Sequence, residues 1–158
     1  MDVLLYATEN ARNLGSIVRT SSAFGLKKIY LYDKYCLLSH EESVKGIRET
    51  SRGHCLEIVK VENPLEFILK YDFKFATTLG KGAKKLGDPK YNIILPENAL
   101  IIFGGETRGL PKEISKSTSR IVIPTRGMDY CLSLPVAYGI VLYEFLRQNP
   151  NKFPARGS

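Results

Sequence analysis

The residue best suited to chemistry is Glu106, which follows Gly104 and Gly105 directly after an apolar run. That run, residues 99–103, has no polar break, which is typical of a strand covered on both faces. The two glycines allow backbone angles, and a close approach by a ligand, that a Cβ would obstruct. Ligands bind at the carboxyl ends of strands in an open parallel sheet, so the pattern predicts Glu106 at the mouth of a site. An ordinary tight turn with solvated charges stays open as the alternative.

A second group of polar residues lies near the start of the chain, on a predicted helix with Asn13 as its N-cap. An asparagine side chain there can accept a hydrogen bond from a free amide of the first turn. Arg19 points away from the apolar stripe of this helix, and Gly25 is a natural left-handed stop. The stripe consists of Leu14, Ile17, Val18 and Phe24. For Arg19, a solvated surface arginine is the alternative.

The elements that must position these residues alternate between strand and helix patterns. The strands are predicted at residues 2–7, 29–32, 56–61, 74–78, 99–103 and 120–124. The helices are predicted from residue 13, at 41–50, from 64, at 112–117 and at 133–147. Alternation of this kind favours an α/β fold, with a mostly parallel sheet and helices on both faces. We expect one domain, residues 1–148, followed by a polar tail, residues 149–158.

Two segments point to partners. Residues 136–146 of the last predicted helix are apolar nearly all round, so this helix is expected to pack on a second subunit as well as on its own sheet. Residues 80–90 form a loop rich in glycine and lysine that lacks the Gly-x-x-x-x-Gly-Lys-Ser/Thr phosphate pattern. A contact with an RNA backbone and a plain solvated loop are both compatible with this composition.

Composition narrows the class of protein. The 158 residues include 23 Lys and Arg against 16 Asp and Glu, a net charge of +7 that suits a polyanion such as RNA. No apolar run reaches the roughly 18 residues of a membrane span, and the start is not a signal peptide. The cysteines and histidines have no zinc-binding spacing, which predicts a reduced cytoplasmic protein without a metal and with its cysteines buried. The cysteines are Cys36, Cys55 and Cys131.

Three segments match, in the same order, the motifs of one family. They read Asn13-x-Gly15-x-x-x-Arg19-Thr20, then Phe103-Gly104-x-Glu106-x-x-Gly109-Leu110, then Ile123-Pro124 followed by Cys131-Leu132-Ser133-Leu134-Pro135. With them the chain resembles the SpoU/TrmH branch of the SPOUT RNA methyltransferases, over nearly its whole length. The lack of an N-terminal extension makes it most similar to the small members that modify the tRNA anticodon loop.

The resemblance implies a fold, a reaction and an assembly. Family members carry a deep C-terminal trefoil knot, work as homodimers, and transfer a methyl group from S-adenosylmethionine to a ribose 2′-hydroxyl of tRNA or rRNA. Carried over by position, the cofactor contacts come mostly from the backbone. They fall on Gly104, Gly105, Ile123 and Leu132, with Thr77 and Thr78 lining the pocket.

The resemblance also implies catalytic roles. Arg19 would act near the 2′-hydroxyl, and a grip on the adjacent phosphate suits its guanidinium better than a role as base. Asn13 would help to position Arg19 and the ribose, Glu106 would orient that network, and Ser133 would offer a hydroxyl. Alignment of the hydroxyl with the activated methyl carbon is then the main catalytic demand.

The third motif departs from the family pattern Ser-Leu-Asn-x-Ser. Its serine, asparagine and second serine are here Cys131, Ser133 and Pro135. This motivates an alternative, an RNA-binding relative that keeps the fold but has reduced or lost catalysis. An unrelated α/β nucleotide enzyme is a third hypothesis, which the absence of Gly-x-Gly-x-x-Gly and of the phosphate-loop pattern disfavours.

Overall fold

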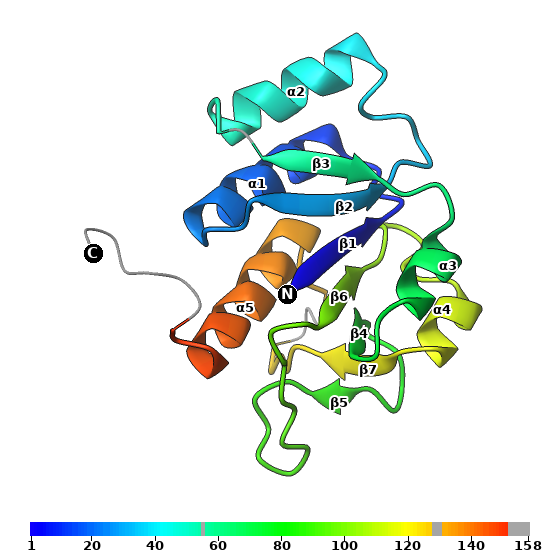
Figure 1. Ribbon diagram of the computed structural model, residues 1–158, viewed down its shortest axis with the longest axis vertical. Helices are drawn as coiled ribbons and strands as arrows, with labels where there is room; N and C mark the ends of the chain where they lie inside the picture. The colour runs from blue at the N-terminus through cyan, green and yellow to red at the C-terminus, as the bar shows by residue number, and fades with distance from the viewer. Residues whose placement is uncertain (55, 128–130, 152–158) are drawn as a thin grey trace.

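The computed structural model describes residues 1–54, 56–127 and 131–151. In this part of the chain, seven strands form a single sheet in which every neighbouring pair is parallel (Figure 1). The strands are β1 (Asp2–Tyr6), β2 (Lys28–Tyr32), β3 (Glu57–Lys60), β4 (Lys74–Thr77), β5 (Lys84–Lys85), β6 (Leu100–Phe103) and β7 (Ser119–Val122). Their order across the sheet is β3-β2-β1-β6-β4-β7-β5. The predicted α/β class is confirmed.

Helices cover both faces of the sheet, as predicted. They are α1 (Ala11–Ala23), α2 (Glu41–Ser51), α3 (Pro64–Leu69), α4 (Lys112–Lys116) and α5 (Leu134–Gln148). Figure 1 shows α1, α2 and α5 on one side of the sheet and α3 and α4 on the other. Because side chains alternate along a strand, Val3 and Leu5 pack under the first group, whereas Leu4 packs under the second.

The N-cap predicted for the first helix is wrong by three positions. Asn10 is the N-cap residue, and its side chain accepts from the amides of Arg12 and Asn13. Asn13 therefore lies in the first turn, with its side-chain amide free to contact another element. The predicted stop is confirmed, since Gly25 follows the helix with φ of 77°.

The contact between α1 and α2 explains why position 15 is a glycine. A Cβ on Gly15 would lie 2.6 Å from the carbonyl oxygen of Ile47 and 2.8 Å from Cβ of Thr50. The two helices therefore approach at backbone distance. This packing holds α1 in place against its neighbour, and with it the start of the helix that carries Asn13.

The last helix, α5, is buried along one face only in this single chain. Tyr138, Val141, Leu142 and Phe145 are buried. The Tyr138 hydroxyl shares a 2.5 Å hydrogen bond with Ser21 of α1, and burial raises the pKa of Tyr138. On the opposite face Val136, Ile140 and Tyr143 are exposed. The described residues of this chain therefore leave the outer apolar face of α5 exposed, and this is the face for which the sequence predicts a second subunit.

Three further expectations need correction or lie outside the described residues. The loop of residues 80–90 contains the edge strand β5, which pairs with β7 and was not predicted. Cys36 and Cys131 are exposed rather than buried, and Cys55 is outside the described residues. Most of the predicted tail, residues 152–158, is also outside them. Among the described residues, no helix combines the length and the apolar character needed to cross a bilayer.

Candidate active site

The parallel register brings three predicted cofactor positions to one edge of the sheet. Strand β4 lies between β6 and β7, with Ala76 opposite Ile102 and Thr77 opposite Ile121. The strand ends that carry Thr78, Gly104 and Ile123 are therefore adjacent. The Thr77 hydroxyl donates to the carbonyl oxygen of Ile102 at 3.2 Å, and the Thr78 amide donates to that of Ile121 at 3.0 Å.

The glycine pair after β6 is required by the packing of the protein's own backbone, whereas the predicted approach of a ligand to it stays a prediction. Neither glycine has a positive φ, and the space that a Cβ would need is filled by the protein's own backbone. A Cβ on Gly104 would lie 2.6 Å from the carbonyl carbon of Gly109. One on Gly105 would lie 2.6 Å from the carbonyl oxygen of Ala7. Gly104 thus closes its own loop, and Gly105 lets that loop touch the end of β1.

Glu106 joins this loop to the start of α1. Its Oε1 accepts from the Asn13 side-chain amide at 2.9 Å, and its Oε2 accepts from the Glu9 backbone amide at 2.8 Å. Both carboxylate oxygens are therefore occupied, although the side chain is exposed. The sequence-predicted pair Asn13 and Glu106 is brought together in one hydrogen-bonded unit.

Glu9 forms the reciprocal half of the same contact. Its Oε2 accepts from the Thr107 hydroxyl at 2.7 Å and its Oε1 from the Thr107 amide at 3.1 Å. These two hydrogen bonds lower the pKa of Glu9, and the positive charges of Arg108 and Lys34 act in the same direction. Glu9, in the segment after β1, and Glu106, in the loop after β6, thus each accept hydrogen bonds from the other's segment.

Sequence reasoning missed Glu9 and Thr107, which lie 98 positions apart. The available signal was weak. Glu9 follows a predicted strand end, as Glu106 does, and the carboxyl ends of neighbouring parallel strands meet at one edge. That β1 and β6 are such neighbours was decided by the strand order, which periodicity does not reveal.

Arg19 is not part of this unit within one chain. Its side chain is exposed, and no described residue forms a hydrogen bond or ion pair with it. Six residues along a helix amount to about 9 Å of rise and a turn to another face, so Asn13 and Arg19 do not meet. The direct positioning of Arg19 by Asn13 is not seen, and the role of Arg19 stays a prediction.

The third motif supplies Leu132 and Ser133 just before α5. Leu132 is half-buried, and Ser133 is the exposed N-cap residue of α5, whose hydroxyl makes no capping hydrogen bond. Pro135 falls in the first turn of the helix, as predicted. Among the described residues, no hydrogen bond joins Leu132 or Ser133 to the strand ends of β4, β6 and β7. Their places in a site stay predictions.

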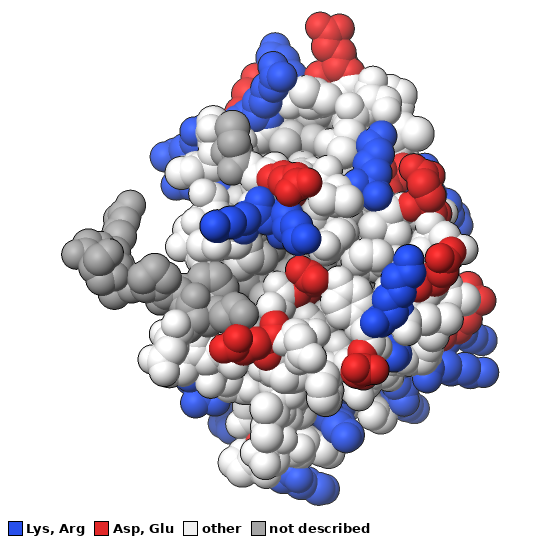
Figure 2. Space-filling view, in the orientation of Figure 1, with Lys and Arg blue, Asp and Glu red and all other residues white. Residues whose placement is uncertain are grey.

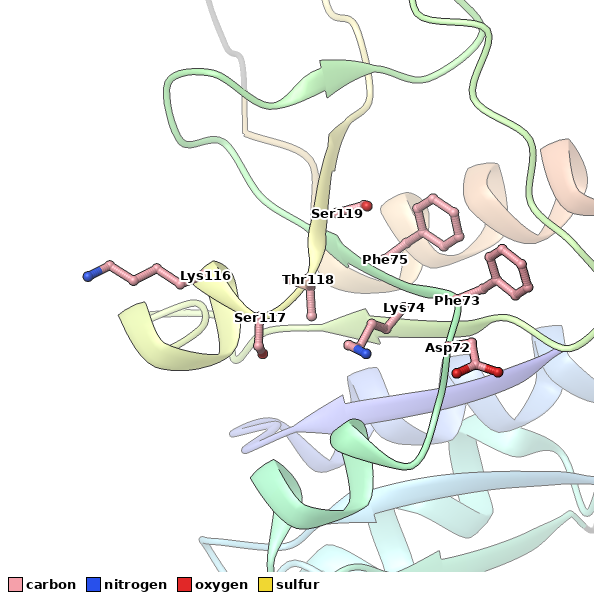
Figure 3. Close-up of a pocket in the computed structure, with 8 residues that line it drawn as sticks. All are labelled: Asp72, Phe73, Lys74, Phe75, Lys116, Ser117, Thr118 and Ser119. Atoms are coloured by element: carbon pink, nitrogen blue, oxygen red, sulfur yellow. The ribbon is translucent and has the colours of Figure 1, made fainter.

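Two cavities in the described part of the chain bear on the location of the site, and the smaller of them lies near these residues. The larger, about 240 Å³, is at the amino-terminal ends of β4 and β7, where Lys74 and Ser119 begin their strands (Figure 3). In Figure 3 the side chain of Lys116 points away from the cavity. Ligands of parallel sheets bind at the opposite edge, so this cavity is not the active site.

The smaller cavity, about 150 Å³, adjoins the Glu106 loop, and we call it the carboxyl-edge pocket. It is lined by Tyr6, Ala7, Glu9, Lys34, Tyr35, Gly105, Arg108, Gly109, Leu110 and Pro111. Its walls therefore come from the segment after β1, the segment after β2 and the loop after β6. No group of three or more His, Cys, Asp or Glu side chains able to hold a metal occurs among the described residues.

On the face seen in Figure 2, surface charge is mixed rather than gathered into one patch. Figure 2 shows Lys and Arg interspersed with Asp and Glu over the described part of this face. On this face the net charge of +7 is thus not expressed as one continuous basic patch. A polyanion would therefore bind this face at individual basic side chains, because the face has no continuous positive patch to attract it.

Comparisons with known proteins agree with the geometry. The family model described as the SpoU rRNA Methylase family matches residues 1–143. The tRNA (guanosine(18)-2′-O)-methyltransferase of Aquifex aeolicus is 31% identical over an alignment of 163 positions. The alignment covers 96% of this chain and 72% of that protein.

Two solved structures have the same fold. One, from a study of the 2-OH methylation of C/U34 on tRNA, has a TM-score of 0.80 at 26% identity, with 94% of this chain and 95% of that chain covered. The other, an AdoMet-bound rRNA methyltransferase from Sinorhizobium meliloti, has a TM-score of 0.76 at 25% identity and covers 92% of this chain and 55% of its own. This protein belongs to the SpoU rRNA methylase family.

Proposed function

We propose that this protein transfers a methyl group from S-adenosylmethionine to a ribose 2′-hydroxyl of RNA, either tRNA or rRNA. The observation that carries the proposal is the Asn13–Glu106 hydrogen bond beside the glycine turn, at the carboxyl edge of the sheet. Family membership supports the reaction class, because the matched relative from Aquifex aeolicus is named a tRNA 2′-O-methyltransferase.

The strand ends of β4, β6 and β7 suit the adenosyl part of the cofactor. Gly104 and Ile123 present backbone groups there, and Thr78, whose amide is bonded to Ile121, can offer its carbonyl oxygen. Apolar side chains beside them can cover a planar base. Leu132, Gly105 and Thr77 complete the proposed binding set. S-adenosylmethionine contributes an activated methyl group, and the protein residues hold and orient it. The AdoMet-bound relative from Sinorhizobium meliloti supports S-adenosylmethionine as the cofactor.

A homodimer is part of the proposal. The exposed apolar face of α5, formed by Val136, Ile140 and Tyr143, is the surface we assign to the partner. Helix α1 packs against α5, with Thr20 Cγ2 3.8 Å from the Cβ position of Gly139. Arg19, the exposed neighbour of Thr20 on α1, is the residue that we propose to reach the site of a second subunit. There its guanidinium would grip the phosphate beside the target ribose.

The remaining expectations also belong to the proposal. We infer that residues 1–148 form one methyltransferase domain with a C-terminal knot, and that the protein acts in the cytoplasm. The solved structure from the study of 2-OH methylation of C/U34 on tRNA supports a tRNA anticodon-loop nucleotide as target. An RNA-binding relative without catalysis is the second candidate, motivated by Cys131, Ser133 and Pro135 in the third motif.

The test is transfer of tritiated methyl from S-adenosylmethionine to total tRNA and rRNA from a strain that lacks the gene. We expect incorporation by the wild type and none by Arg19→Ala, with cofactor affinity by calorimetry nearly unchanged. Arg48→Ala, which removes another exposed arginine, is the matched control. RNA and cofactor binding without transfer would favour the second candidate, and equal loss of affinity and transfer in Arg19→Ala would make Arg19 structural.

A further inference from the structure

The carboxyl-edge pocket has a lining unlike that of a packing defect. Two cations, Lys34 and Arg108, face a single carboxylate, Glu9, and two tyrosines, Tyr6 and Tyr35, supply aromatic surface. At about 150 Å³ it has half the volume of the smallest typical pockets for whole small molecules, which begin near 300 Å³. It suits one ring or one phosphate of a larger ligand that continues outside.

The segment after β2 presents Lys34 and Tyr35 in a defined conformation. The Asp33 carboxylate accepts from the amides of Leu37 at 2.7 Å and Leu38 at 3.1 Å, and its side chain is only 4% exposed. The Cys36 amide donates to the Asp33 carbonyl oxygen at 3.1 Å, which closes the turn. Such local hydrogen bonds reduce the entropy that a ligand would otherwise have to remove.

Tyr35 keeps an exposed ring within this ordered segment. The side chain is 38% exposed, and Lys34 Nζ lies 5.9 Å from the ring centroid. An aromatic ring beside a lysine is the combination that proteins use to stack a base of single-stranded RNA while holding its phosphate.

The opposite wall belongs to the loop that contains Glu106. Arg108 lies two positions after Glu106 in this loop. Glu9, the one carboxylate of the lining, has both oxygens occupied by Thr107. These hydrogen bonds stabilise the carboxylate but leave its charge in place, and the two cations of the lining outnumber it. The pocket thus favours an anion and adjoins the Asn13–Glu106 pair.

We propose that the carboxyl-edge pocket binds the nucleotide that adjoins the target nucleotide in the RNA strand. Its base stacks on Tyr35, and its phosphate contacts Lys34 and Arg108. This inference rests on the proposed function, because it takes the Asn13–Glu106 pair to mark where the target ribose lies. It assigns substrate recognition to residues outside the cofactor-binding set.

The experiment measures RNA affinity of the full chain by fluorescence anisotropy, with labelled total tRNA at several salt concentrations. Lys34→Ala and Arg108→Ala should each weaken binding about fivefold and reduce the slope of log Kd against log salt by about 1. Tyr35→Ala should weaken binding about fivefold with an unchanged slope, and Tyr35→Phe should bind as the wild type does. Cofactor affinity should not change.

Lys28→Ala is the matched control, because Lys28 also lies over a tyrosine ring, 5.1 Å from Tyr30, but at the amino end of β2. Wild-type affinity in all three pocket variants, with methyl transfer intact, would overturn the subsite and leave the proposed function standing. Loss of binding in the lysine and arginine variants, with Tyr35→Ala unaffected, would contradict a nucleotide as occupant. A wild type that neither binds nor methylates RNA would overturn the proposed function itself.

Discussion

Asn13 and Glu106 are 93 positions apart, yet the Asn13 side-chain amide donates to Oε1 of Glu106 at 2.9 Å. The other oxygen of the same carboxylate accepts from the backbone of Glu9. One side chain therefore connects the strand end of β1, the first turn of α1 and the loop after β6. This contact fixes where α1 begins relative to the cofactor edge.

Replacement of Glu106 by alanine should loosen this connection. Two donors lose an ionised acceptor, and since the site is exposed we expect a loss of about 1–2 kcal/mol in the free energy of unfolding. Methyl transfer should fall by at least about tenfold, which corresponds to about 1.4 kcal/mol in the barrier. Urea denaturation and transfer assays measure the two effects. Glu62→Ala, an exposed acid elsewhere, should change neither, and wild-type activity in Glu106→Ala would remove Glu106 from the site.

Gly105→Ala should destabilise the protein by about 1–3 kcal/mol, because the new methyl group would lie 2.6 Å from the Ala7 carbonyl oxygen. Gly46→Ala on α2 is the opposite case. Its Cβ would meet its nearest neighbour at 3.7 Å, so it should stabilise by about 0.5–1 kcal/mol. Thermal denaturation measures the melting temperatures of the two variants. If Gly105→Ala melted at the same temperature as Gly46→Ala, the loop and β1 would not be held at backbone contact.

Thr107→Val should change how stability depends on pH. In the wild type the pKa of Glu9 is lowered below its ordinary value of about 4.5, chiefly by the Thr107 hydroxyl. A lowered pKa contributes stability above pH 4.5, and this contribution is lost as the pH falls through the folded pKa. The variant should therefore lose less stability than the wild type between pH 5 and pH 3, and the Glu9 carboxyl carbon should titrate at higher pH by NMR. Identical titration curves would contradict the assigned hydrogen bond.

Ile140→Glu should separate the proposed dimer. Ile140 is 38% exposed on the apolar face of α5, and a charge buried at a subunit interface is strongly unfavourable. Sedimentation velocity should give a dimer for the wild type and a monomer for the variant, with the same far-ultraviolet circular dichroism. Leu69→Glu, on the exposed side of α3, should leave the assembly unchanged. A monomeric wild type would rule out a site shared between subunits.

Most helices and strands could be predicted from the sequence without tertiary information. Apolar runs such as Leu100–Phe103 and the stop at Gly25 reflect local chemistry, and the observed strand boundaries differ from the predicted ones by one or two residues. The two-residue strand Lys84–Lys85 escaped notice, because two lysines carry no hydrophobic signal and pair only because β7 lies beside them. Likewise, Asn10 and Asn13 are equally good N-caps by residue type, and only the observed start of α1 at Ala11 shows that Asn10 is the cap.

The sequence by itself determined the α/β class, the family and the pair of glycines beside Glu106, because these depend on residue type and on spacing along the chain. Only the tertiary structure decided that Gly105 touches Ala7, that Glu9 binds Thr107, and that Lys34, Tyr35 and Arg108 line one pocket. Those contacts join segments far apart in the chain, and they exist because β1 lies between β2 and β6 in a parallel sheet. Strand order is a property of how the whole core packs, and no local pattern encodes it.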